Sequence, residues 1–364
     1  INSYNTWRPF TSMKESGLIL SSVENSELTY EKKHELNIGA EIGFIDNRIN
    51  IEADWYTRNN FDLIGLIYTK GTGGQLAKFA NVASMKSSGV EFTVSTRNIK
   101  TKDFSWNTDF IFSHTKNEVT DLQSNASVMD MISGNGFAME GYPVRALFSL
   151  DFQGLNENGY PTFINEKGQL TVSDINFQEQ LKKDHLVYEG PTDPTMTGSL
   201  GNIFRYKGFT LNAFITYSFG NVIRLDPVFH NVYSDLDAMP REFINRWTAG
   251  GDEKVTNVPV IADKRANQQD PYLSYAYNAY NYSTERIAKG DFIRMKELSL
   301  SYNFPKKMIS RLKVNDLSLK IQATNLFLIY SDKKLNGQDP EFFNTGGVAS
   351  PVPRQFTLTL RLGI

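Results

Sequence analysis

Hydrophobic and polar residues alternate along much of this 364-residue chain. The final nine residues, 356–364, alternate without a break, and residues 36–44 and 49–55 follow the same pattern. Successive side chains point to opposite faces of a β-strand, whereas a helix repeats about every 3.6 residues. The pattern therefore predicts strands. They are expected at residues 31–45, 48–60, 88–98, 104–116, 144–153, 196–206, 209–222, 290–304, 314–330 and 354–364.

Each predicted strand has one apolar row and one polar row. Val90, Phe92 and Val94 form an apolar row, and Glu91 and Arg97 belong to the opposite row of the same strand. Charges on the second face favour a water-filled lumen over the dry core of a sandwich. This pattern predicts an all-β fold in which the apolar row faces lipid and the polar row faces a lumen.

The connections between these segments fall into two length classes. Residues 46–47 and 207–208 are short turns, whereas 117–143 and 223–289 run to tens of residues. Short turns at one end and long loops at the other are typical of outer-membrane barrels. The sequence therefore predicts an antiparallel transmembrane β-barrel with long extracellular loops.

Strand direction gives a test of this prediction. If the last strand runs inward and ends in the periplasm, the directions agree only when one more outward strand lies between residues 153 and 196. Residues 160–164 are the candidate, because they follow a turn-like Asn-Glu-Asn-Gly sequence. The count is then eleven strands, which we interpret as half of a barrel whose first strands are not in this chain. Two short helices are also expected, at 235–248 and 305–312, the first with Phe243, Ile244 and Trp247 on one face.

Composition excludes several other classes of protein. Apolar residues make up 40% of the chain, the mean hydropathy is −0.37, and no stretch approaches the ~18 apolar residues of a transmembrane helix. A net charge of −2 gives no reason to expect nucleic acid as a partner. The chain has no cysteine, and its four histidines show no metal-ligand spacing. No nucleophile motif is present. We therefore expect no catalytic residue, no metal site, no cofactor and no enzyme activity.

Several strings of residues make the interpretation more specific. They are ELTYEKKHELNIGAEIGFIDNRINIEADWYTRNNFDLI, NVASMKSSGVEFTVSTRNI, FSWNTDFIFSHTKNEVTDL, NRWT, GDFIRMKELSLSYNFPKK, QATNLFLI and PVPRQFTLTLRLGI. In this order and spacing they resemble SusC/RagA-like TonB-dependent outer-membrane transporters, from about residue 26 to the end. The resemblance identifies residues 1–364 as the C-terminal part of such a β-barrel, about 11 strands of about 22, without the plug domain and the N-terminal half. The family commonly ends on an aromatic residue, where this chain has Ile364.

The resemblance also implies a function for the parent molecule. It implies TonB-dependent import of an oligosaccharide or peptide across a Bacteroidetes-type outer membrane. A SusD-like surface lipoprotein would capture the substrate, and TonB–ExbB–ExbD would supply energy through the missing N-terminal region. Two alternatives stay open: a non-transporting outer-membrane barrel that serves as a scaffold or in adhesion, and a soluble carbohydrate-binding β-sandwich.

Two groups of residues are candidates for contact with substrate. Aromatic rings gather in one long connection, where tyrosine offers a large amphipathic surface at low cost in conformational entropy. These residues are Trp247, Tyr272, Tyr275, Tyr277, Tyr280 and Tyr282. The alternative is that the rings pack the loop against its neighbours. Arg97, Arg294 and Lys320 are expected to face the lumen, where they could touch substrate or pair with a plug domain. The acidic residues at 339–343 could bind Ca²⁺, but a solvated extracellular loop is the favoured interpretation.

Overall fold

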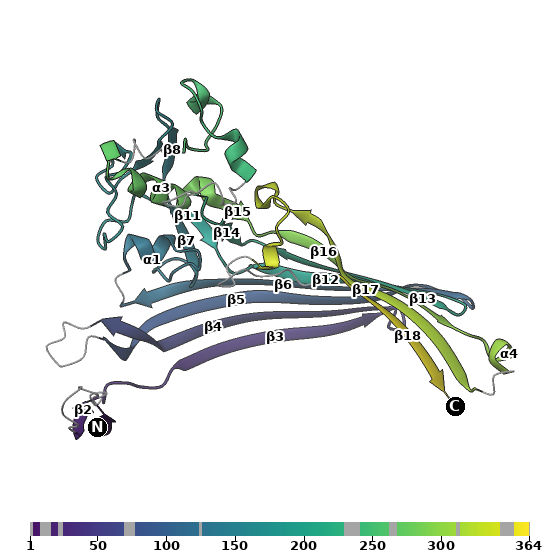
Figure 1. The fold of residues 1–364 in the computed structure, drawn as a ribbon. Helices are drawn as coiled ribbons and strands as arrows, with labels where there is room; N and C mark the ends of the chain where they lie inside the picture. Colours follow the sequence, from purple (N-terminus) through teal and green to yellow (C-terminus); the bar gives the residue numbers. More distant parts are fainter. Residues whose placement is uncertain are drawn as a thin grey trace.

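A single antiparallel sheet of nine strands dominates the computed structural model (Figure 1). The structure describes residues 3–7, 16–20, 25–68, 77–123, 126–228, 241–261, 268–310, 314–342 and 353–363, so Ile364 lies outside the described residues. The strand order is β18-β17-β16-β13-β12-β6-β5-β4-β3. The bounds are β3 Lys32–Phe44, β4 Ile49–Tyr68, β5 Ala77–Lys100, β6 Phe104–Leu122, β12 Met196–Tyr206, β13 Phe209–Phe219, β16 Phe292–Asn303, β17 Asp316–Ser331 and β18 Gln355–Gly363. We call this sheet the wall.

Every neighbouring pair of wall strands is antiparallel, and the register keeps apolar residues on one face. Ala53 lies opposite Phe92, and Phe92 lies opposite Phe112 on the next strand. On the other face Asp54 lies opposite Glu91. A slip of one residue would exchange the two faces, so this alignment is strongly specified wherever one face meets lipid. The nine strands form one sheet rather than two packed layers, which does not fit the β-sandwich alternative.

The short connections all join the wall strands at one end of the sheet (Figure 1). Between β3 and β4, Ile45, Asp46 and Asn47 all have positive φ angles of 53–56°. Lys207, with a φ of 52°, makes the corresponding turn between β12 and β13. The β16–β17 connection contains helix α4 (Lys306–Ile309), which begins after Pro305 and lies within the predicted helix at 305–312. The short connections are therefore confirmed, whereas most of residues 61–87, expected as a long connection, belongs to β4 and β5.

Several wall strands are much longer than a membrane crossing requires. β5 has 24 residues and β4 has 20, whereas a tilted transmembrane strand needs about 9–11. The additional residues of β4 and β5 lie at the end of the sheet where the long connections join the strands. Among the described residues, no helix is both long and apolar enough to cross a membrane.

The long connections fold together above the wall (Figure 1). We call this part the cap, and it comprises residues 126–195, 221–228, 241–261 and 268–291. Its strands are β7 Ala146–Leu150, β8 Phe152–Leu155, β9 Pro161–Ile164, β10 Leu170–Thr171, β11 Leu186–Pro191, β14 Val222–Arg224 and β15 Ile287–Lys289. Its helices are α1 Val128–Ile132, α3 Leu273–Asn281 and the 3₁₀ turns η1 Arg241–Asn245, η2 Asp252–Lys254 and η3 Thr284–Arg286. Two further 3₁₀ turns, η5 Lys333–Leu335 and η6 Pro340–Phe342, follow β17, and a separate hairpin joins β1 Ser3–Trp7 to β2 Ser16–Leu20.

A hydrophobic core holds the cap together. Met131, Ile132, Phe148 and Phe163 are fully or almost fully buried and belong to one cluster. Helix α1 begins with a capping box, in which Ser127 and Asp130 satisfy each other's backbone N–H groups. The cap therefore has the internal packing of a small domain and is not a set of independent loops.

Two predicted wall strands belong to the cap, and the prediction was wrong on this point. Residues 144–153 contain β7, which pairs with β11, and residues 160–164 contain β9, which pairs with β8 and β10. All five residues of β7 are buried, so neither face of this strand meets solvent or lipid. The wall passes directly from β6 to β12, and the alternating strand directions are satisfied without the extra strand.

The predicted helix at 235–248 is only partly described. Residues 229–240 lie outside the described residues, and the remainder contains η1. Phe243 is buried in the cap core, whereas Ile244 is exposed. The expected common face with Trp247 is therefore not formed in the described part.

The assignment of faces can be tested with two adjacent residues of β18. We expect Leu358→Arg to lower the unfolding free energy of the full-length protein by roughly 2–4 kcal/mol, because it places a charge on the lipid face. Thr359→Arg, on the lumen face, is the matched control and should change stability little. Urea titration in lipid vesicles measures both. Equal losses would contradict the assignment.

Candidate functional site

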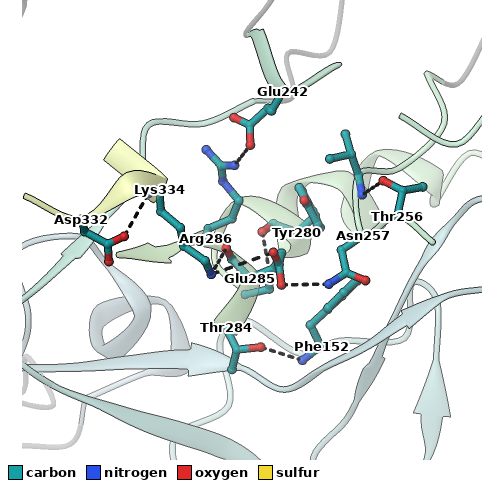
Figure 2. A network of polar contacts seen from close by, with 12 residues as sticks. Phe152, Glu242, Thr256, Asn257, Tyr280, Thr284, Glu285, Arg286, Asp332 and Lys334 are labelled. Atoms are coloured by element: carbon teal, nitrogen blue, oxygen red, sulfur yellow. Dashed lines mark hydrogen bonds and ion pairs between the residues drawn. The ribbon is translucent and has the colours of Figure 1, made fainter. Parts of the chain in front are cut away.

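The cap contains a polar network that joins loops far apart in sequence (Figure 2). The buried Arg286 guanidinium forms an ion pair with Glu242 and donates a hydrogen bond to the Asp226 carbonyl at 2.7 Å. Its neighbour Glu285 accepts a hydrogen bond from Asn257 at 3.1 Å. Lys334 Nζ lies 3.9 Å from the Glu285 carboxylate. Residues 284–286 therefore join the 241–261 segment to the segment after β17.

A second buried arginine lies at the centre of the cap. Arg224 donates hydrogen bonds to the Ser283 carbonyl at 3.0 Å, the Phe148 carbonyl at 2.6 Å and the Ser149 hydroxyl at 3.0 Å. Burial lowers the pKa of Arg224 to about 10, which still leaves it protonated at neutral pH. Burial also raises the pKa of Glu189, although the Ser149 hydroxyl and the charge of Arg224 oppose that shift. Arg224 therefore acts as a structural cation, and its two terminal nitrogens donate to two carbonyls and one hydroxyl.

The predicted tyrosine-rich segment is a helix, α3, and two of its rings form part of the core. Leu273, Ala276, Tyr277 and Tyr280 recur at helical spacing and are buried. The Tyr277 hydroxyl donates a hydrogen bond to the Val260 carbonyl at 2.5 Å. Tyr280 packs edge-on against Phe152. The rings of Tyr277 and Tyr280 therefore pack the cap and offer no surface to a ligand in this conformation.

The other aromatic candidates have different environments. Tyr272 and Tyr275 are exposed, with ring centroids 6.0 Å apart. Trp247 is half-buried, packs over Gly159 and donates its indole N–H to Glu253 at 3.1 Å. Tyr282 is also half-buried, and its ring centroid lies 5.8 Å from the Arg224 guanidinium. Tyr272 and Tyr275 keep the exposed ring faces that ligand contact requires.

The three cations that were expected to face the lumen are also unlike one another. Arg97 is exposed, and Lys320 Nζ lies 3.8 Å from the Glu297 carboxylate. Arg294 has only 4% of its side chain exposed; it forms an ion pair with Asp339, and its Nε lies 2.8 Å from the Glu341 carboxylate. The acidic residues first considered for Ca²⁺ thus neutralise Arg294, while Phe343 of that loop lies outside the described residues. Arg294 attaches the η6 segment to the wall and is not free to bind substrate.

A cavity of about 580 Å³ lies where the cap meets the polar face of β12, β13 and β16. Its surface is mixed, with apolar groups beside hydroxyl and amide groups and a few charged side chains. The lining residues are Arg145, Thr192, Pro194, Thr197, Gly198, Thr216, Tyr217, Ser218, Asn221, Ile223, Gly290, Phe292, Lys296, Pro340 and Glu341. The polar row of 209–222, with Thr216 and Ser218, was visible in the sequence. Lys296 and Asn221 were missed, because no pattern in the sequence shows which loops close over the wall.

Comparison with known proteins agrees with this geometry. TonB-dependent receptor P3 of Formosa agariphila is 24% identical over 362 residues, which cover 94% of this chain and 34% of the relative. TonB-dependent receptor SusC of Bacteroides thetaiotaomicron is 26% identical over 357 residues, covering 93% and 32%. The resemblance to SusC/RagA-like TonB-dependent receptors is confirmed. No protein-family model matches the chain.

Solved structures show the same fold. The RagAB peptide transporter superposes with a TM-score of 0.77 at 22% identity, over 99% of this chain and 38% of that one. The RagAB peptide importer in its open-open state gives 0.76 at 21% identity, over 100% and 38%. The chain thus spans about a third of the length of the curated relatives that it matches. It contributes antiparallel strands to a bacterial outer-membrane protein of the β-barrel type.

The role of the Arg294 ion pairs can be tested by Arg294→Met. The change leaves two partly buried carboxylates without a partner, and breaking a buried pair in this way costs roughly 3–5 kcal/mol. We expect faster hydrogen exchange in residues 332–342 of the full-length protein and a lower unfolding free energy. Arg97→Met, at an exposed lumen position, is the control. Unchanged exchange in Arg294→Met would refute the attachment.

Tyr277 and Tyr275 form a matched pair for testing the packing of α3. Tyr277 is 2% exposed and Tyr275 is 49% exposed. Removal of a buried aromatic ring costs about 3–5 kcal/mol. We therefore expect Tyr277→Ala to lower hydrogen-exchange protection throughout the cap core and Tyr275→Ala to leave it near the wild-type value. Similar effects of the two changes would contradict the packing seen here.

Proposed function

We propose that this chain is the C-terminal part of a TonB-dependent outer-membrane importer of oligosaccharides or peptides. The observation that carries the proposal is the combination of a two-faced antiparallel wall with a cap built from its long connections. That combination extends over 99% of the chain in the superposition on the RagAB peptide transporter. The names of the relatives, TonB-dependent receptors and SusC among them, support uptake and not catalysis.

The chain's share in transport follows from its two faces. The apolar row meets outer-membrane lipid, and the polar row lines the path of the substrate. The Arg294 ion pairs hold the segment after β17 on the wall, and the contact of Lys334 with Glu285 joins that segment to the cap, so the substrate passes beside a fixed body. No bond chemistry is assigned to these residues. Energy from TonB–ExbB–ExbD would act through regions outside this chain.

A SusD-like surface lipoprotein is the proposed partner for capture. The support is the likeness to SusC and to a transporter named RagAB. Within the cap, Tyr272 and Tyr275 are the proposed ring contacts for sugar faces or peptide side chains, since their rings are exposed and adjacent. Trp247 has less free surface because Gly159 lies against it.

Growth of a deletion strain on defined glycans and peptides tests the proposed function. We expect loss of growth on at least one oligosaccharide or peptide source, restored by the full-length gene and abolished again by a tonB deletion. A double Tyr272→Ala, Tyr275→Ala variant should weaken ligand binding while membrane insertion stays normal.

Two results would count against import. If every nutrient supports normal uptake while surface attachment is impaired, the scaffold or adhesion alternative is the better account. If uptake persists without TonB, the energy source is assigned wrongly.

A further inference from the structure

The cavity beneath the cap has the polarity of a binding site for a hydroxylated or amide-bearing oligomer. Thr216 and Ser218 line it from the wall, and Thr192 and Asn221 line it from the cap. Asn221 donates to the Thr192 carbonyl at 3.4 Å, while its Oδ1 is shielded and accepts no hydrogen bond from the described residues. A shielded acceptor without a donor is uncommon in folded proteins. Because that oxygen is shielded, it does not face a bound molecule, and the polar character of the site comes from the hydroxyl groups that line it.

The charges around the cavity do not cancel. Arg145 is 2.7 Å from the Asp193 carboxylate, and Glu341 is 2.8 Å from Arg294. The third charged lining residue, Lys296, is half-buried, and its side chain makes no ion pair or hydrogen bond with any residue that the structure describes. Within the part of the chain that the structure describes, one ammonium therefore has no counter-charge in a partly enclosed space. Such a site favours an anionic group, because the surrounding protein weakens solvent screening.

The backbone at Lys296 is irregular in a way that favours a functional interpretation. Ile215 pairs with Met295 and Phe214 with Glu297, so Lys296 is a bulged residue between two regular stretches of β16. The ladder to β17 is interrupted at the same place, next to Asn325, which has a φ of 53°. A bulge adds one residue to a strand and redirects its side chain at the cost of ladder hydrogen bonds. Here it adds a lysine to the cavity while Met295 and Leu298 keep their places opposite apolar partners.

We propose that Lys296 binds a carboxylate of the imported oligomer. The proposal rests on the function proposed above and adds the substrate class, an acidic oligomer. A carboxylate fits because one unpaired ammonium matches one negative charge and forms a charge-assisted hydrogen bond with it. Uronate residues of oligosaccharides and the acidic groups of peptides share this chemistry.

The test compares ligands that differ only in charge, using the full-length protein purified in detergent. One arm uses tetragalacturonate and its methyl ester, and the other uses a tetrapeptide with a free C-terminal carboxylate and its amide. In one arm we expect the carboxylate form to bind roughly fivefold more tightly, from the difference between charged and neutral hydrogen bonds. Calorimetry gives the affinity of the charged and of the neutral form in each arm. The arm in which the charged form binds more tightly shows whether the carboxylate belongs to an oligosaccharide or to a peptide.

Variants then assign the preference to Lys296. Lys296→Gln should remove the preference for the carboxylate form and leave the affinity for the neutral form unchanged. Lys296→Arg should keep the preference. Lys320→Gln, which removes another lumen cation, is the matched control and should also keep it. The proposal would be overturned if Lys296→Gln kept the full preference for the carboxylate form. It would also be overturned if the wild-type protein bound both forms equally, a result that would favour pairing of Lys296 with a plug domain. If neither arm binds and uptake is also absent, the proposed function itself is contradicted.

Discussion

The alternation of side chains along each wall strand is the constraint on which the rest of the structure depends. A backbone in lipid must satisfy all its hydrogen bonds internally, and a sheet of paired strands does so along its whole length. Once the strands are paired, alternate residues face lipid and the residues between them face water. Leu358, Leu360 and Leu362 of β18 thus lie on the same face as Ile321, Leu319 and Leu317 of β17. The ladder fixes where each lumen side chain can lie before any substrate is considered.

The cap is governed by a different balance. Its segments lie outside the lipid, so they need a core of their own, and they bury long polar side chains within it. Arg224 and Arg286 are acceptable there only because carbonyls and a carboxylate receive their N–H groups. Removal of any one partner leaves a buried charge, so these arginines make the arrangement of the loops specific. The wall is thus ordered by periodicity and the cap by individual contacts.

This difference explains how far the sequence could predict the structure. The wall strands repeat one simple pattern, and the register of Ala53, Phe92 and Phe112 follows from it. In the cap, residues 146–150 are apolar and short, so sequence alone cannot separate a buried cap strand from a lipid-facing one. The helical spacing of Leu273, Ala276, Tyr277 and Tyr280 was available, but five tyrosines in eleven residues suggested a binding surface. Contacts such as Arg294 with Asp339 join residues 45 positions apart, and no local pattern predicts them.

The same reasoning separates cations that hold the fold from a cation that can serve a ligand. Three positive side chains near the cap–wall junction look alike in sequence: Arg224, Arg294 and Lys296. The first donates to backbone carbonyls in the core, and the second is neutralised by two carboxylates. Both are arginines, whose planar guanidinium suits several fixed acceptors at once. The third is a lysine, a compact charge on a flexible stem, placed by a bulge against a polar cavity. No carboxylate of the described residues pairs with that lysine, and its place at the cavity is the reason for assigning it to a ligand that brings its own negative charge.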